Sequence, residues 1–229
     1  MDERKMALLS QIIKQHIKTA SPISSKLLAS MSRFNVSPAT IRNEMAELEE
    51  EGYITHPHTS AGRLPTEKGY HFYLENLIKS SELLEIEQRT LKEYFNNLKG
   101  QELELMIKNL AKKLVVYSNN TVVVGFSPDN VYYTGVANLF TQPEFCHPNG
   151  IYNISLLVDH LDKVMAEIFD EVNEVEVKVG SENPFSNNTS VVLTPWQLKN
   201  RHGILGILGP LRMDYEHNLG LAKFINQLI

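Results

Sequence analysis

The sequence predicts the α+β fold class, with a helical amino-terminal part and a second part that mixes strands and helices. Apolar residues recur at helical spacing through most of residues 1–117, and beyond Asn120 the pattern shortens toward a period of two. Hydrophobic residues make up 42% and charged residues 21% of the 229 residues, which is ordinary for a globular chain and argues against general disorder. The single cysteine, Cys146, excludes an intramolecular disulfide and a four-cysteine zinc site.

The first predicted helix covers residues 3–19, where apolar residues recur on one face. Pro22 prevents this helix from continuing. Ser24 is the expected N-cap of a short second helix over residues 25–31.

A third helix has the clearest start signal in the chain. Ser37 is a favoured N-cap, and Pro38 suits the first helical position. Gly52 is a good stop because it tolerates positive φ, so we expect the helix to end at Glu51. Its apolar positions are Ile41, Met45 and Leu48.

A two-stranded wing is predicted after the third helix. Residues 53–54 begin a short strand, and residues 55–65 hold two prolines and one glycine. Residues 59–62 are typical of a hairpin tip, and Thr66 is the expected cap of a fourth helix over residues 67–79. The order helix, helix, turn, helix, wing is that of a winged helix-turn-helix.

The second part begins with two helical patterns within residues 82–117, broken at residues 99–100. A further amphipathic helix is marked by apolar residues between Leu157 and Val172, and a last helix begins near Asp214. The predicted order is β-β-α-β-β-β-α. The predicted strands are residues 122–126, 131–137, 175–180, 190–194 and 203–208.

The net charge of −5 conceals an asymmetry between the two parts. Residues 1–79 carry ten Lys and Arg against nine Asp and Glu, whereas residues 80–229 carry twelve against eighteen. Five of the nine acids crowd the third helix, so the remaining surface of the first part is more basic than its total suggests. The net charge therefore neither favours nor excludes nucleic-acid binding. The prediction of DNA binding depends on how the residues are arranged. The five acids are Glu44, Glu47, Glu49, Glu50 and Glu51.

The third helix is the candidate recognition helix. Its first turns present small residues, an Asn43 suited to bidentate pairing with adenine, and an Arg42 suited to guanine or phosphate. The alternative is the solvated face of an ordinary helical bundle. The wing adds hydroxyl groups, backbone amides and Arg63, which can touch phosphates or enter a minor groove. The predicted DNA-binding residues are Ser25, Lys26, Ser37, Ala39, Thr40, Arg42, Asn43, His58, Thr59, Ser60, Gly62 and Arg63.

Metal and catalytic sites are not predicted. His56 and His58 share one strand face, but no third or fourth zinc ligand lies nearby in the sequence. Cys146 and His147 are adjacent in the chain, and adjacent residues rarely face each other. We expect Asp214 to cap the last helix and Arg212 to pair with a carboxylate, an arrangement that competes with anion binding. The chain is thus predicted to be a protein without enzymatic activity or cofactor.

Glycines recur at every third position of the run Gly203-Ile-Leu-Gly-Ile-Leu-Gly. This spacing differs from that of a dinucleotide-binding loop, and it lacks a strand–turn–helix setting. A strand with close backbone contacts explains it better.

Several long motifs carry a family resemblance. The run Val36-Ser-Pro-Ala-Thr-Ile-Arg-Asn-Glu-Met-Ala-Glu-Leu-Glu-Glu, followed by His58-Thr-Ser-Ala-Gly-Arg and Pro65-Thr-Glu-Lys-Gly-Tyr-His-Phe-Tyr, resembles the HrcA family of heat-inducible transcription repressors. In the second part, Asn138-Leu-Phe-Thr-Gln-Pro-Glu-Phe, Gly180-Ser-Glu-Asn-Pro and Gly209-Pro-Leu-Arg-Met-Asp-Tyr resemble later motifs of that family, in the same order.

The resemblance implies a repressor of chaperone operons that binds an inverted-repeat operator as a homodimer, with activity tied to the chaperonin. It also implies a winged helix over residues 1–79, a helical connector over residues 80–120 and a GAF-like domain over residues 121–229. The family inserts a dimerising domain into the GAF-like domain. Here residues 119–133 are nearly all that remains of that region, and Leu211 stands where the family usually has threonine.

The sequence therefore predicts a DNA-binding repressor, and the alternative is a ligand- or protein-sensing interaction module without specific DNA binding. No signal peptide or membrane span is visible, so we expect a cytoplasmic protein.

Two surfaces are candidates for the dimer contact. The favoured one is formed by the helices within residues 81–117, which carry more apolar residues than one face can bury; the other is a sheet edge or the last helix, around Phe224 and Leu228. The apolar residues of the favoured surface include Leu84, Leu91, Phe95 and Leu105.

Overall fold

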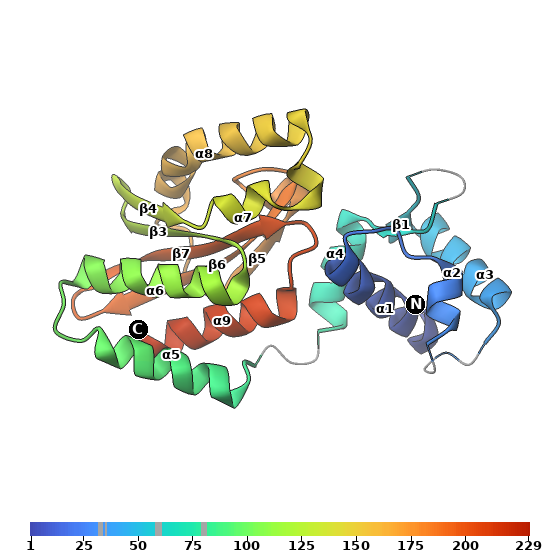
Figure 1. Cartoon of the computed structure of the whole chain (residues 1–229), viewed down its shortest axis with the longest axis horizontal. Coiled ribbons are helices and arrows are strands. Elements are labelled where there is room, and N and C mark those ends of the chain that lie inside the picture. Colours follow the sequence, from blue (N-terminus) through green and yellow to red (C-terminus); the bar gives the residue numbers. More distant parts are fainter. Residues whose placement is uncertain (32–33, 35, 58–60, 79–81) are drawn as a thin grey trace. The chain divides into compact units, whose positions relative to one another are not determined.

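A computed structural model of the chain describes residues 1–31, 34, 36–57, 61–78 and 82–229. Two units, Met1–Lys79 and Ser80–Ile229, each have their own buried core (Figure 1). Helices and strands mix in the second unit, which confirms the α+β class. None of the helices in the described ranges is long and apolar enough to cross a lipid bilayer.

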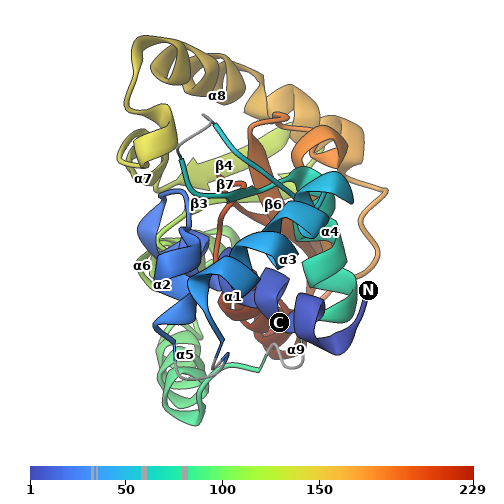
Figure 2. The ribbon, with the colours of Figure 1, turned by 90° about the vertical axis from the view of Figure 1, so that its right-hand side faces the viewer.

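The described residues of the first unit form a bundle of four helices with a two-stranded hairpin (Figures 1 and 2). Residues from α1 and α3 supply most of its core, including Leu9, Ile13, Ile41 and Leu48, none of which is exposed. Its elements are α1 (Glu3–Thr19), α2 (Ser25–Ala29), α3 (Pro38–Glu50), β1 (Ile54–Thr55), β2 (Leu64–Pro65) and α4 (Glu67–Asn76).

The predicted N-caps are confirmed. The hydroxyl groups of Ser24, Ser37 and Thr66 each accept a hydrogen bond from the backbone N–H three residues later, at 3.2, 3.1 and 3.1 Å. The predicted helix ends are less accurate, because α2 stops two residues early and α4 stops three residues early. Such ends depend on packing that local sequence does not encode.

The second unit contains one five-stranded antiparallel sheet in the order β4-β3-β7-β6-β5. The predicted order of strands and longer helices is confirmed. The elements are α5 (Glu85–Asn97), α6 (Leu103–Ser118), β3 (Thr121–Ser127), β4 (Asn130–Thr134), α7 (Ala137–Phe140), η1 (Pro143–Phe145), α8 (Pro148–Ile168), β5 (Glu176–Val179), η2 (Gly180–Glu182), β6 (Thr189–Leu198), β7 (Arg201–Pro210) and α9 (Tyr215–Leu228).

Helices cover both faces of this sheet. α8 covers one face, where its apolar stripe joins a core with side chains of β3, β6 and β7 such as Val123, Leu193 and Ile204. α6 and α9 cover the other face, and α5 lies outside them (Figure 1). The Tyr94 hydroxyl of α5 donates to the carbonyl of Asn109 in α6 at 3.4 Å.

Three sequence predictions for this unit need correction. The strand predicted over residues 131–137 ends at Thr134, because Gly135 adopts a φ of +81° and the chain turns into α7. β6 and β7 run about twice as far as predicted because they pair over ten residues each. Leu91 and Phe95 are buried, so they are not part of an exposed apolar remainder.

Candidate nucleic-acid interface

The start of α3 is fixed by its cap. Ser37 accepts from the Thr40 amide, and the hydroxyl oxygens of these two residues lie 3.0 Å apart. Because Pro38 occupies the first helical position, the helix direction is set from its first turn. The first turn carries Ala39, which is exposed, and Thr40, which is partly buried.

One face of α3 is buried and the opposite face is exposed, as the sequence predicts. Ile41, Met45 and Leu48 are buried against the bundle. Arg42 and Asn43 are exposed, and neither side chain forms a hydrogen bond or ion pair with any residue that the structure describes. A guanidinium and a carboxamide held on a rigid helix without internal partners are available to base edges and phosphates.

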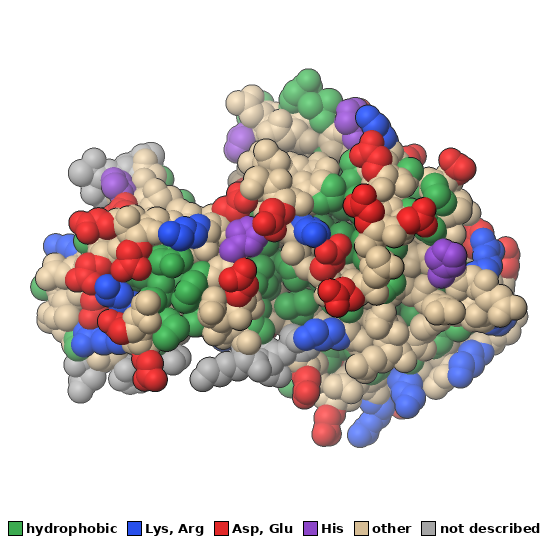
Figure 3. Space-filling view, turned by 180° about the vertical axis from the view of Figure 1, so that it is seen from behind, with side chains coloured by type: hydrophobic (Ala, Val, Ile, Leu, Met, Phe, Trp, Pro, Cys, Tyr) green, Lys and Arg blue, Asp and Glu red, His purple; other side chains and the backbone are tan. Residues whose placement is uncertain are grey.

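The acids in the later turns of α3 are mostly neutralised by α1. Arg4 pairs with Glu44 at 2.8 Å, and Lys5 pairs with Glu47 at 2.6 Å and with Glu51 at 3.3 Å. The hydrogen bond to Glu47 raises the pKa of Lys5 above its ordinary value, so the ammonium stays charged. Figure 3 shows such intermixing of acidic and basic side chains on one face of the first unit. The field along α3 is therefore less negative than its sequence suggests.

The wing is joined to the start of α2 by backbone pairing. Ile23 and Arg63 exchange two backbone hydrogen bonds, each 2.8 Å long, in an antiparallel bridge. A Cβ on Gly62 would lie 2.6 Å from the backbone of Ile23, so only glycine fits at this position. Of the predicted wing contacts, His58, Thr59 and Ser60 lie outside the described residues.

Arg63 is held by the recognition-helix candidate itself. Its Nη2 lies 2.7 Å from Oε2 of Glu49, and the other oxygen of this carboxylate contacts Nδ1 of His56. The Arg63 side chain is 20% exposed. Sequence reasoning missed this pairing, although the five crowded acids of α3 were a signal that a cation of the wing could find a partner there.

One hollow of about 380 Å³ brings several predicted contacts together. It is lined by Ser25 of α2, Arg42 of α3 and Gly62 and Arg63 of the wing, with Met45 among its apolar neighbours. Lys26, Ala39 and Asn43 are exposed but do not line this hollow. The hydroxyl, guanidinium and backbone groups around it are the groups that contact DNA phosphates in proteins.

The residues that were considered for metal binding, catalysis and anion binding have partners within the protein. His56 is paired with Glu49, and no cluster of metal-ligating side chains occurs within the described ranges. His147 Nδ1 accepts from the Gly150 amide at 3.0 Å and caps α8, while Cys146 donates to backbone carbonyls. Arg212 binds the Glu144 carboxylate, as predicted for its side chain.

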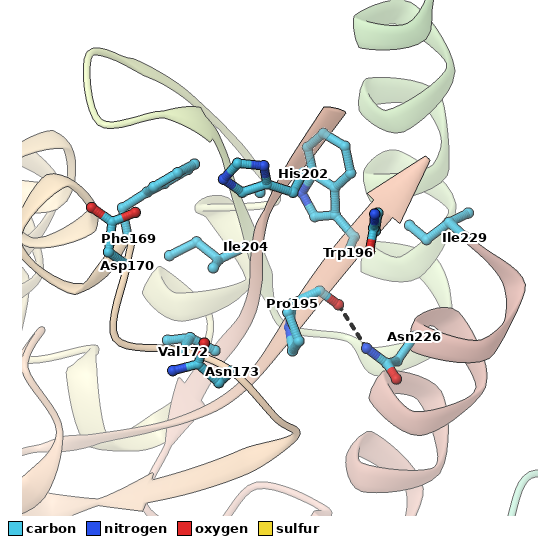
Figure 4. Close-up of a pocket in the computed structure, with 12 residues that line it drawn as sticks. Phe169, Asp170, Val172, Asn173, Pro195, Trp196, His202, Ile204, Asn226 and Ile229 are labelled. Carbon is cyan, nitrogen blue, oxygen red and sulfur yellow. Dashed lines mark hydrogen bonds between the residues drawn. The ribbon is translucent and has the colours of Figure 1, made fainter. Parts of the chain in front are cut away.

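A second hollow, of about 610 Å³, lies in the second unit (Figure 4). Trp196, Phe169 and Ile204 are buried among its lining residues, and Asp170 and His202 are exposed. None of its twelve lining residues is Lys or Arg, so it lacks the charges that bind anions. The indole N–H of Trp196 is buried without a hydrogen-bond partner among the described atoms.

Two family models match the chain. One, described as the HrcA protein C-terminal domain, matches residues 67–218, and a DeoR-like helix-turn-helix domain matches residues 11–66. A protein of known structure, a hypothetical protein with 18% identity, shares the fold at a TM-score of 0.72 over the full length of both chains. This likeness supports the fold alone.

Curated relatives share one name. The chain is 28% identical to the heat-inducible transcription repressor HrcA of Natranaerobius thermophilus, over 98% of this chain and 95% of that protein. It is 47% identical to the HrcA of Acetivibrio thermocellus over 48% of this chain and 31% of that protein. The first alignment spans 329 residues against a chain of 229, so at least 100 positions of the relative have no counterpart here. That difference agrees with the predicted shortening.

Proposed function

This chain belongs to the HrcA family, and on that premise we propose that it represses transcription by binding double-stranded DNA through its first unit. In this proposal α3 enters the major groove and the wing contacts the flanking backbone. The chain works as a DNA-binding protein, with residues 1–79 as the DNA-binding domain, 80–120 as a connector and 121–229 as a reduced GAF-like domain.

The unpaired Arg42 and Asn43 on the outer face of α3 carry the proposal. The neighbouring acids are held by Arg4 and Lys5, which leaves these two side chains as the uncompensated polar groups of the first turns. Asn43 is suited to adenine and Arg42 to guanine or phosphate. If α3 were an ordinary solvated helix, nothing would explain why its acids are paired while Arg42 and Asn43 are left without partners among the described residues.

The family resemblance supports finer details of the proposal. The operator is an inverted repeat, the regulated genes are chaperone operons, the repressor is a homodimer, and the chaperonin modulates it. A two-fold dimer suits an inverted repeat because each protomer reads one half-site.

Selection of bound sites from random duplex, followed by anisotropy titration, tests the proposal. We expect submicromolar binding to a selected inverted repeat, steep weakening with added salt as phosphates regain counterions, and much weaker binding to a scrambled duplex of equal length. Equal affinity for the two duplexes would remove the case for specific repression.

The second candidate is a sensing module, and the hollow around Trp196 is the observation that favours it. It predicts that DNA affinity is low and sequence-independent. Substitution of Arg42 and Asn43 distinguishes the two functions, because only DNA recognition requires these side chains.

A further inference from the structure

The hollow of about 610 Å³ in the second unit lies at the end of β6 that extends beyond β5. β5 pairs with β6 only as far as Leu193, whereas β7 pairs with β6 as far as Leu198. Residues that follow α8 and the end of α9 line the hollow together with these two longer strands. The Asn226 side chain of α9 donates to the Pro195 carbonyl of β6 at 2.9 Å (Figure 4). This hydrogen bond holds one wall of the hollow in place.

One hydrogen-bond donor at the hollow has no partner. Trp196 is 1% exposed, and its Nε1–H has no acceptor among the described atoms. The indole ring is not free to turn toward one, because it packs edge-to-face on Phe126 and lies so close to Gly203 that a Cβ there would be 2.5 Å from it. Buried tryptophan N–H groups usually have a partner, and a buried donor without one is costly. A ligand that places an acceptor at this point would satisfy the donor.

The side chains next to Trp196 at the rim are exposed and able to move. Gln197 and His202 form the cross-strand pair that follows the pair of Trp196 and Gly203, and both are exposed. Figure 4 shows the His202 ring between Phe169 and Trp196, and its centroid lies 5.9 Å from that of Phe169. The indole nitrogen has almost no accessible surface in this arrangement, so an acceptor reaches it only after a rotamer change at the rim. Exposed side chains change rotamer within picoseconds to nanoseconds.

The lining residues define the kind of ligand that fits. Asp170 is an acid, and none of the lining residues is Lys or Arg, so a carboxylate or phosphate would be held without a cation, which is costly. Phe169 and Ile204 are buried and offer apolar surface for a ring. The fitting ligand is therefore uncharged, is flat and apolar over most of its surface, and carries a carbonyl oxygen as the acceptor for the indole N–H.

We propose that this hollow binds a small, uncharged aromatic carboxamide. Its carbonyl oxygen accepts a hydrogen bond from Trp196 Nε1 once His202 has moved aside, and its ring packs against Phe169 and Ile204. Binding here supplies the ligand class that a sensing role of the second unit would need. It involves neither DNA nor a second copy of the chain, so ligand binding and the proposed DNA binding can each fail without the other.

The single tryptophan makes the test direct, because one indole N–H signal is expected in a two-dimensional nitrogen–proton NMR spectrum of the full chain. Benzamide is the probe, and benzoate, which has the same ring with a carboxylate, is the matched control ligand. We expect benzamide to move the indole signal saturably, with a dissociation constant of ~1 mM or below, as suits a ligand of so few atoms. Benzoate is expected to bind at least ~10-fold more weakly, because its charge meets no cation in the hollow.

Two substitutions separate the donor from the charge of the hollow. Trp196→Phe keeps an aromatic ring and removes the N–H group, so calorimetry is expected to show benzamide binding at least ~5-fold more weakly. Asp170→Asn keeps the size of the side chain and is expected to narrow the preference for benzamide over benzoate by ~3-fold or more. Asp159→Asn removes the same charge from an exposed position of α8 outside the hollow and is expected to change neither affinity. Circular dichroism confirms that each variant is folded.

Three results would overturn the proposal. The first is an indole signal that ~10 mM benzamide leaves in place. The second is benzoate binding as tightly as benzamide to the wild-type chain, and the third is unchanged benzamide affinity in a folded Trp196→Phe variant. Operator binding is measured separately by anisotropy, so any of these results would leave the proposed repressor function standing.

Discussion

The guanidinium of Arg63 in the wing forms an ion pair with the carboxylate of Glu49 in α3, with 2.7 Å between Nη2 and Oε2. The pair fixes the wing against the helix proposed to read DNA. A carboxylate presents two oxygens to a guanidinium much as a phosphate does. Glu49 therefore occupies the position on Arg63 that a DNA phosphate would need.

We expect Glu49→Gln to strengthen binding to duplex DNA by ~3- to 10-fold at low salt, because the change frees Arg63 and removes a negative charge. Anisotropy titrations over a series of salt concentrations measure the gain. Glu50→Gln is the matched control, since it removes the same charge from the next residue, which is exposed and has no partner among the described residues. Equal gains in the two variants would show that net charge alone is responsible.

Asn43→Ala is expected to cost ~1–3 kcal/mol of binding free energy and to relax base preference at one position of each half-site, because a bidentate contact to one base is lost. Binding to a panel of single-substituted operators measures both effects. Asn96→Ala makes the same change on an exposed face of α5 and is expected to have no effect. Unchanged affinity and preference in a folded Asn43→Ala variant would mean that α3 does not read bases there.

Arg63→Ala is expected to weaken binding to all duplexes alike and to lower the slope of log K against log salt by ~1, because one phosphate contact is lost. Arg89→Ala serves as the control, because it also removes one positive charge, from an exposed position on α5. A loss confined to one operator sequence would instead assign Arg63 to base recognition.

Gly203→Ala is expected to destabilise the chain by ~1–3 kcal/mol, because the new methyl group would lie 2.1 Å from the Gly125 carbonyl oxygen and 2.5 Å from the Trp196 ring. Gly206→Ala lies on the same strand, but its nearest contacts are side-chain methyl groups at 3.2 and 3.3 Å, so we expect a smaller cost. Urea unfolding of both variants measures the difference, and similar midpoints would contradict the role of close backbone packing at Gly203.

Local signals predicted the helical starts well. Ser24, Ser37, Thr66 and Asp214 are all N-caps, because a cap depends on the few residues that follow it. The cap that His147 supplies to α8 was not predicted, because histidine is uncommon at N-cap positions.

Features that depend on distant contacts could not be predicted. The pairing of Glu49 with Arg63 joins residues fourteen apart through a turn whose geometry the sequence leaves open. Leu91 and Phe95 are buried because other parts of the second unit cover them, and the pattern of one helix does not show what packs on it. The exposure of Arg42 and Asn43 opposite the buried face of α3 followed from helical spacing, whereas the ion pairs of the acids of α3 with Arg4 and Lys5 did not.

The chain has a single tryptophan, Trp196, and it is only 1% exposed in the second unit, with its ring edge-to-face against Phe126 at 5.8 Å between centroids. Its emission is consequently a spectroscopic signal of residues 80–229 alone, whereas far-ultraviolet ellipticity also includes the four helices of the first unit. Denaturation followed by the two signals therefore resolves whether the units melt together or separately, because coincident transitions are the mark of a single cooperative step.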